Sequence, residues 1–155
     1  EDRQLAYVQK HLRILSAFYG VLEPMDGVTP YRLEMQAKVG IGAAKNLYDY
    51  WGERLYRSVI DDSRVIINLA SKEYSKCIEK YLTPKDTYIT VSFCELSGNK
   101  LVTKGTYAKM ARGEMVRFMA EREIENPEEI RKFDRLGYTF RRDLSSESEY
   151  VFERK

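Results

Sequence analysis

The chain has 155 residues, of which 43% are hydrophobic and 32% are charged, and its formal net charge is +2. This composition is typical of a globular protein and excludes a disordered chain, and the length suits one domain with a buried core. The small net charge does not by itself indicate a nucleic-acid partner, and no apolar run reaches the roughly 18 residues of a membrane span.

The first part of the chain reads as two helices separated by a long loop. Apolar residues recur at helical spacing from Asp2 to Tyr19 and the run stops at Gly20, which predicts one helix over residues 2–19. Prolines and glycines punctuate residues 21–45, so we expect a loop there. Asn46 is a good N-cap residue, and we expect it to begin a second helix that runs to about Val59.

The middle of the chain predicts a strand, a helix and a hairpin. Residues 64–69 form a β-branched apolar run of strand length, and Ser71 can cap a helix over residues 72–81. Residues 88–96 alternate well enough for a second strand. Turn residues then lead into a returning strand from Leu101, so we expect a β-hairpin here.

The last third predicts a long helix, a short helix and two strands. Thr106 is expected to cap the long amphipathic helix, and Asn126 a short helix that ends near Phe133. Residues 137–140 and 150–152 read as two closing strands. The sequence therefore predicts an α+β (mixed α/β) fold in a single domain, with helices packed on a small mixed sheet.

Histidine and cysteine are scarce. The single histidine, His11, cannot build a His-rich metal site or a Ser-His-Asp triad within this chain, and we expect it to be structural. Cys77 and Cys94 have no close spacing, which fits a reducing compartment. They would sense peroxide only with stabilised thiolates, so buried inert thiols are the favoured interpretation. We predict a cytoplasmic protein with no metal site and no cofactor.

Residues 39–45 (VGIGAAK) form a glycine-rich segment with two interpretations. They do not fit a phosphate loop, because Lys45 is followed by Asn46 rather than by Ser or Thr. The apolar-Gly-apolar-Gly order also occurs in helix-hairpin-helix DNA-binding motifs, where backbone amides approach a phosphate. A plain glycine loop that leads into the helix at Asn46 is the favoured alternative.

Two short constellations offer acid–base chemistry. Arg32 and Glu34 point the same way if their segment is extended, so they form either a salt bridge or part of a site. Glu73 lies where the predicted strand turns into a helix, a common place for sites in α/β proteins, although it can equally be a helix cap. Glu34 and Glu73 are the candidate catalytic carboxylates. The residues expected to line a cleft beside them are Tyr31, Trp51, Asn68, Ser71 and Tyr74.

A basic stretch surrounds the start of the long helix. Its cations include Lys104, Lys109, Arg112 and Arg117, and the only acidic residue among them is Glu114. Such a row can track a phosphate backbone, with Tyr107 as a ring for base stacking. The alternative is a solvated helix face with no ligand.

Five separate runs of the sequence follow a known pattern. The runs are residues 19–26 (YGVLEPMD), 30–35 (PYRLEM), 47–52 (LYDYWG), 67–74 (INLASKEY) and 108–113 (AKMARG). In this order they resemble the YaaA family of bacterial peroxide-stress-response proteins. The family pattern begins earlier, with a strand similar to ILISPAK, so we expect residues 1–155 to be the C-terminal portion of a single YaaA-like domain.

The resemblance implies a role in protection during peroxide stress, linked to keeping free intracellular iron low. It also implies DNA binding through a positively charged cleft, which makes DNA the expected partner. Our first hypothesis is therefore a DNA-binding stress protein that uses the basic residues of the long helix, with Arg32 as a further nucleic-acid-binding residue near the cleft. The alternative is an enzyme that acts on a nucleotide-like small molecule or a nucleic-acid base, with Glu34 or Glu73 as acid or base. A third interpretation makes these charged pairs internal ties of the fold.

Overall fold

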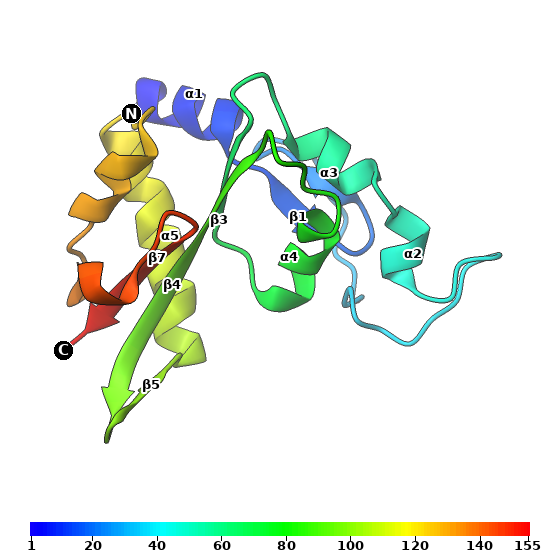
Figure 1. The fold of residues 1–155 in the computed structure, drawn as a ribbon. Coiled ribbons are helices and arrows are strands. Elements are labelled where there is room, and N and C mark those ends of the chain that lie inside the picture. Colours follow the sequence, from blue (N-terminus) through cyan, green and yellow to red (C-terminus); the bar gives the residue numbers. More distant parts are fainter. The chain divides into compact units, whose positions relative to one another are not determined.

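The computed structural model describes residues 1–155 and shows an α+β protein with a mixed sheet, as the sequence predicts (Figure 1). Contacts between Cα atoms divide the chain into two compact units. Unit 1 comprises residues 1–10, 67–69 and 88–155, and unit 2 comprises residues 11–66 and 70–87. The single domain expected over the whole chain stays a prediction.

Unit 1 contains most of a five-stranded mixed sheet. The strands are β3 (Val65–Asn68), β4 (Thr87–Ser97), β5 (Lys100–Val102), β6 (Tyr138–Phe140) and β7 (Glu149–Arg154). Their order is β3, β4, β7, β6, and β5 pairs with β4. β4 and β7 run parallel, whereas β5 is antiparallel to β4 and β6 is antiparallel to β7. The predicted hairpin and the two closing strands are therefore confirmed.

Helix α5 (Gly105–Glu121) packs on one face of this sheet (Figure 1). Ile89, Val91 and Phe93 of β4 are buried in the same core, because alternate side chains of a strand point to one face. The buried residues of α5 recur at helical spacing and include Ala108, Ala111, Met115 and Phe118. This packing decides which side of α5 faces outward.

Aromatic rings fill the core of unit 1. Phe93 and Phe152 are register partners on β4 and β7, and their ring centroids lie 5.6 Å apart. The ring of Phe133 lies 5.7 Å from each of them. Phe133 follows the short 3-10 helix η1 (Pro127–Lys132), which Asn126 caps as predicted. A second 3-10 helix, η2, spans Arg142–Leu144.

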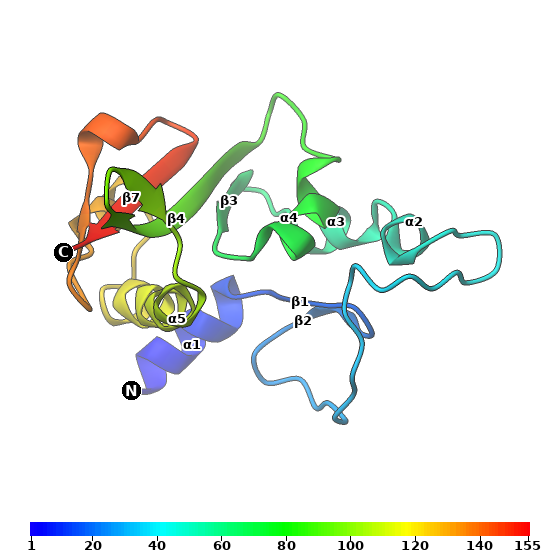
Figure 2. The same ribbon diagram turned by 90° about the horizontal axis from the view of Figure 1, so that it is seen from below.

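The first helix is shorter than the sequence predicts. Helix α1 spans Asp2–His11 and lies beside the C-terminal end of α5 (Figure 2). There the Tyr7 hydroxyl donates a 2.7 Å hydrogen bond to the carbonyl oxygen of Ile124. Burial, together with the charge of Glu125, raises the pKa of Tyr7 to about 12. The prediction of one helix over residues 2–19 is wrong.

A two-stranded hairpin in unit 2 replaces the second half of that helix. β1 (Ile14–Ser16) pairs antiparallel with β2 (Gly20–Leu22). Gly20 has a φ of +85°, which favours glycine, and an added Cβ would lie 2.8 Å from the ring of Trp51. The Trp51 Nε1–H donates a 2.9 Å hydrogen bond to the carbonyl oxygen of Ala17. These contacts with Trp51 favour the hairpin. Trp51 is far from the hairpin in the sequence, so the spacing of residues 2–19 cannot reveal them.

Three short helices carry the core of unit 2. They are α2 (Leu47–Trp51), α3 (Arg54–Val59) and α4 (Lys72–Glu79). Asn46 caps α2 as predicted, because its side chain accepts a 2.8 Å hydrogen bond from the N–H of Asp49. The predicted helix does not continue unbroken to Val59. Gly52, with a φ of +52°, ends α2, and α3 begins after it.

Residues 23–46 contain neither helix nor strand, in keeping with the predicted loop. The only β-bridge in this segment joins Ile41 and Ala44. It closes a tight turn that contains Gly42, whose φ is +58°. No helix lies between β2 and this turn, so the segment is a glycine loop that leads into α2 rather than a helix-hairpin-helix motif.

Two helix starts differ from the predicted caps. Ser71 occupies the N-cap of α4, but its side chain makes no capping hydrogen bond. Thr106 lies inside α5, and Lys104 is the N-cap residue of that helix. None of the helices is long and apolar enough to cross a membrane.

Candidate functional site

The outward side of α5 carries two cations that the fold leaves unpaired. Lys109 is exposed and Arg112 is half-buried, and neither side chain forms an ion pair. They lie three residues apart and are therefore neighbours on the helix surface. Beside them Gly113 has no side chain, and an added Cβ would meet nothing within 4 Å. This stretch presents two free positive charges next to open backbone surface.

The other two cations predicted to contact phosphates are held by carboxylates. Lys104 Nζ lies 2.6 Å from a Glu95 oxygen, and this hydrogen bond raises the pKa of Lys104 and lowers the pKa of Glu95. Arg117 pairs with Glu121 one turn further along, at 2.8 Å. Glu121 also pairs with Arg135. Lys104 and Arg117 therefore add less positive field than the sequence suggests.

Tyr107 already has a cation on its ring. The guanidinium carbon of Arg154 lies 3.7 Å from the ring centroid of Tyr107, which is a cation–π contact. Arg154 also lies 3.4 Å from a Glu95 oxygen. The ring takes part in the contacts that join the ends of β4 and β7 to α5.

In unit 2, residues 30–35 are anchored by Met35, which is fully buried. The Tyr31 hydroxyl lies 2.5 Å from the Ser16 hydroxyl, and the Tyr31 ring lies 5.3 Å from that of Phe18. Phe18 and Tyr31 are 57% and 41% exposed. The segment is thus held in place while it displays aromatic rings at the surface.

Arg32 and Glu34, within that segment, have no partner in the fold. Both residues are exposed, and neither side chain makes a hydrogen bond or an ion pair. The salt bridge that their spacing allows does not form. Both charges are therefore available to a ligand.

Replacing Arg32 with alanine is expected to change the free energy of unfolding by less than about 0.5 kcal/mol, because this exposed residue forms no internal hydrogen bond or ion pair. Met35→Ala is the positive control and should cost about 2 to 5 kcal/mol, because Met35 is 0% exposed. Urea denaturation of both variants is the measurement. A large loss of stability in Arg32→Ala would make Arg32 an internal tie of the fold.

Glu73 and Tyr74, at the start of α4, lie against the same segment. Glu73 Oε1 accepts a 3.2 Å hydrogen bond from the backbone N–H of Gln36. Burial, followed by the charge of Glu73, raises the pKa of Tyr74, and the nearby Tyr31 and Glu34 act in the same direction. The structure therefore brings Tyr31, Glu34, Glu73 and Tyr74 together in unit 2.

The other residues expected to line a cleft serve the fold of their own units. Asn68 belongs to unit 1, where it is 7% exposed and its amide donates a 3.3 Å hydrogen bond to Thr90 Oγ1. Trp51 packs against Gly20 in unit 2, and Ser71 stands at the start of α4. Their role in a cleft stays a prediction.

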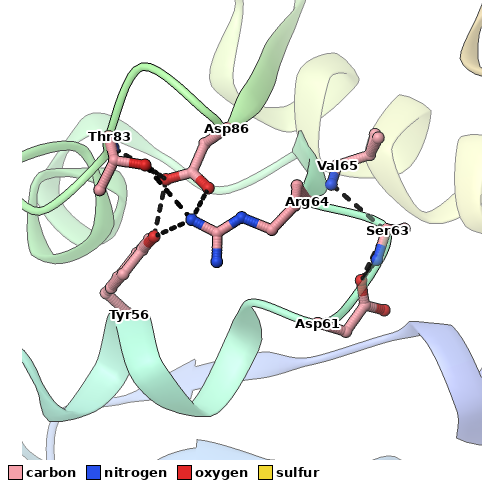
Figure 3. Close-up of polar contacts among 7 residues, drawn as sticks. All are labelled: Tyr56, Asp61, Ser63, Arg64, Val65, Thr83 and Asp86. Atoms are coloured by element: carbon pink, nitrogen blue, oxygen red, sulfur yellow. Dashed lines mark hydrogen bonds and ion pairs between the residues drawn. The ribbon is translucent and has the colours of Figure 1, made fainter.

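A buried charged cluster in unit 2 was not predicted from the sequence (Figure 3). The Asp86 carboxylate is 1% exposed, and its Oδ1 lies 2.5 Å from Arg64 Nη2. Its Oδ2 accepts hydrogen bonds from the Tyr56 hydroxyl at 2.7 Å and from the Thr83 backbone N–H at 2.8 Å. Arg64 has a φ of +59°, which is uncommon for a residue other than glycine. The partners all belong to unit 2, so we assign the cluster to the fold, and the buried Nε of Arg64 is left without a hydrogen-bond partner.

A group of lysines in unit 2 was missed as well. Lys38, Lys45 and Lys76 line one hollow of about 440 Å³. Two of them flank the glycine loop and the third lies on α4, so no run of basic residues marks the site in the sequence. The glycine-rich segment is the only feature of the sequence that points to this region. The three-dimensional path of the loop has to be known before Lys38 and Lys45 can be assigned to the same site as Lys76.

The cysteines are buried, as predicted, and both thiols are free. Burial raises the pKa of Cys77 to about 11 and also raises the pKa of Cys94. His11 is exposed at the end of α1. The chain contains no group of three or more His, Cys, Asp or Glu side chains placed to hold a metal ion.

Sequence comparisons identify relatives along the whole chain. The profile of the family described as "Peroxide stress protein YaaA" matches residues 1–144. A UPF0246 protein of Agathobacter rectalis is 83% identical over 155 residues, which is 100% of this chain and 62% of the relative. A UPF0246 protein of Lachnoclostridium phytofermentans is 55% identical over 152 residues, which is 98% of this chain and 60% of the relative. The chain spans about three fifths of the length of these curated relatives.

Proposed function

Because the chain belongs to the YaaA family of peroxide stress proteins, we propose that it acts in the response to peroxide by binding DNA through the outward face of α5. The observation that carries the proposal is the pair Lys109 and Arg112, neighbouring cations without a carboxylate partner. A cation in an ion pair has to leave its carboxylate before it contacts a phosphate. An unpaired cation only replaces the counterions bound to the DNA.

Three further cations belong to the DNA-binding proposal, two at α5 and one in unit 2. Arg32 is exposed and unpaired in unit 2, so it is available for a phosphate contact of its own. Lys104 and Arg117 are secondary contacts, because a phosphate there competes with Glu95 and Glu121. We place the protein in the cytoplasm, where bacterial DNA lies. The link to limiting free iron, which the family resemblance implies, belongs to the same proposal, and we assign no iron ligands to it.

The test is a fluorescence-anisotropy titration of the intact protein with a labelled DNA duplex at low salt. Replacing both Lys109 and Arg112 with alanine is expected to weaken binding by about a hundredfold, since one charge-assisted hydrogen bond is worth about a factor of ten. The matched control is Lys132→Ala/Arg142→Ala, which removes two exposed, unpaired cations from the same unit. Circular dichroism should show both double variants folded.

Two outcomes contradict the proposal. If the control pair weakens binding as much as the α5 pair, the attraction reflects total charge and no defined face. If the unaltered protein binds no DNA, the second candidate function gains weight.

The second candidate is an enzyme that acts on a nucleotide or a nucleic-acid base. Glu34 favours it, because this exposed carboxylate has no partner and lies near Tyr74 and Glu73. A carboxylate that is free of internal bonds can accept or donate a proton to a bound base. Glu34→Gln would then abolish turnover and leave the affinity for DNA unchanged, which separates the two functions.

A further inference from the structure

The glycine loop and α4 line a polar hollow of about 440 Å³ that is open to the surface of unit 2, and its three lysines are exposed. Its wall carries three lysines, Lys38, Lys45 and Lys76, together with polar groups of Gln36, Asn46 and Tyr48. No carboxylate lines it. The lining residues therefore offer cationic and neutral polar groups, and the nearest carboxylate that the bonds identify is Glu73, behind Gln36.

The three lysines are not neutralised by the rest of the fold. None of them forms an ion pair or a hydrogen bond through its side chain. A neighbouring hollow of about 340 Å³ shares Lys76 and Tyr48, and Glu79 lies on its wall. Glu79 is held by Lys72 Nζ at 2.6 Å. The carboxylate next to the larger hollow is that of Glu73, which accepts a hydrogen bond from the Gln36 N–H and forms no ion pair with the three lysines.

The wall that carries these lysines is held in shape by several bonds. At one end the N–H of Gln36 donates to the Glu73 carboxylate at 3.2 Å. In the middle, Ile41 and Ala44 exchange two backbone hydrogen bonds of 3.0 Å each. At the other end Asn46 caps α2 through its side-chain oxygen. Lys38 and Lys45 therefore extend from a fixed backbone.

The polar groups of the hollow suit a ligand that accepts hydrogen bonds. Three lysine ammonium groups bring several N–H donors and no acceptor. The Asn46 side-chain oxygen is used by the cap, so its NH₂ group is the part left to bind a ligand. A phosphate group has one or two negative charges at neutral pH and several acceptor oxygens, and lysine binds it as a point charge.

We propose that this hollow binds a phosphate-bearing ligand through Lys38, Lys45 and Lys76. The phosphate comes either from a free phosphorylated molecule or from the backbone of a nucleic acid. The site lies wholly in unit 2 and does not depend on the α5 surface of unit 1. It can hold even if α5 binds no DNA.

Isothermal titration calorimetry of the intact protein with inorganic pyrophosphate is the first arm of the test. The unaltered protein should bind pyrophosphate, and each Lys→Gln substitution at positions 38, 45 and 76 should weaken binding about tenfold. The matched control is Lys10→Gln/Lys85→Gln/Lys132→Gln, which removes the same charge from exposed residues outside the hollow. Lys109→Ala/Arg112→Ala should bind pyrophosphate as the unaltered protein does.

Duplex DNA at several salt concentrations is the second arm, and it distinguishes the two sources of phosphate. If pyrophosphate does not bind but the variant with all three hollow lysines replaced loses DNA affinity and about three units of salt slope, the ligand is a nucleic-acid backbone. If a folded triple variant matches its control in both arms, the proposal is overturned. A loss confined to Lys109→Ala/Arg112→Ala would overturn it in the same way and leave the DNA-binding proposal standing.

Discussion

Replacing Phe152 with alanine is expected to lower the free energy of unfolding by about 3 to 5 kcal/mol. Phe152 is 0% exposed on β7 and lies within 5.7 Å, centroid to centroid, of the rings of Phe93, Phe133 and Phe140. Truncation at this point leaves a cavity that three rings on different elements have to close, and strands cannot shift far without breaking their ladder. Urea denaturation followed by circular dichroism measures the change.

Phe152→Leu is the control for that experiment, because it keeps most of the apolar volume and should cost clearly less than the alanine variant. Equal losses in the two variants would mean that the ring contacts, and not the apolar volume, account for the loss of stability. A loss below about 1 kcal/mol in Phe152→Ala would contradict the central position that the structure gives this residue.

Replacing Asp86 with alanine is expected to lower the melting temperature of the protein by several degrees at neutral pH. The substitution leaves Arg64 without its carboxylate and removes the acceptor for the Tyr56 hydroxyl and the Thr83 N–H. A buried group that loses its partner is left unsatisfied, and this costs more than the bond itself contributes. Asp62→Ala, an exposed carboxylate in the same unit, is the matched control and should change the melting temperature little.

The effect of Asp86→Ala should depend on pH in a defined direction. Burial alone raises the pKa of the Asp86 carboxyl, but the hydrogen bonds from Tyr56 and Thr83 and the charge of Arg64 outweigh it and hold the pKa below the usual value of 3.8. A carboxyl with a lowered pKa contributes stability that is fully present above the unfolded value and is lost as the pH falls through the folded value. The difference in melting temperature between variant and parent should therefore shrink below about pH 4. A difference that grows in acid would contradict the cluster.

Most secondary structure could be predicted where the signal is local. The Asn46 cap, the strand after Arg64 and the hairpin between β4 and β5 each depend on a few neighbouring residues, and all three are present. The length of α1 could not be predicted in this way. Residues 14–19 have helical spacing, but the strand pairing around Gly20 and the contact of Trp51 with that glycine favour a hairpin.

The candidate site, too, could be predicted only where the signal is local. Sequence spacing identified the cations Lys104, Lys109, Arg112 and Arg117, but it gave no means of finding which of them are neutralised. Glu95, the partner of Lys104, lies on the preceding strand and is brought to it by the β4–β5 hairpin. The structure shows that Glu95 neutralises Lys104 and that Glu121 neutralises Arg117. Lys109 and Arg112 are the two cations that remain without a carboxylate partner.

The lysine hollow and the Asp86 cluster could not be predicted at all, because each gathers residues that are far apart in the chain. Lys76 meets Lys38 and Lys45 only when α4 packs beside the glycine loop. Asp86 meets Arg64 only when the segment before β4 lies against the turn before β3. Neither grouping has a period or a spacing that a sequence displays.

The measurement that tests DNA binding most directly is a salt series of the anisotropy titration on the unaltered intact protein. If Lys109 and Arg112 contact phosphates, the logarithm of the association constant should fall linearly with the logarithm of the salt concentration, with a slope of about −2 or steeper. Removing both cations should make that slope shallower by about two units. A slope that is flat in the unaltered protein, or the same in the double variant, would contradict the proposal that α5 binds DNA.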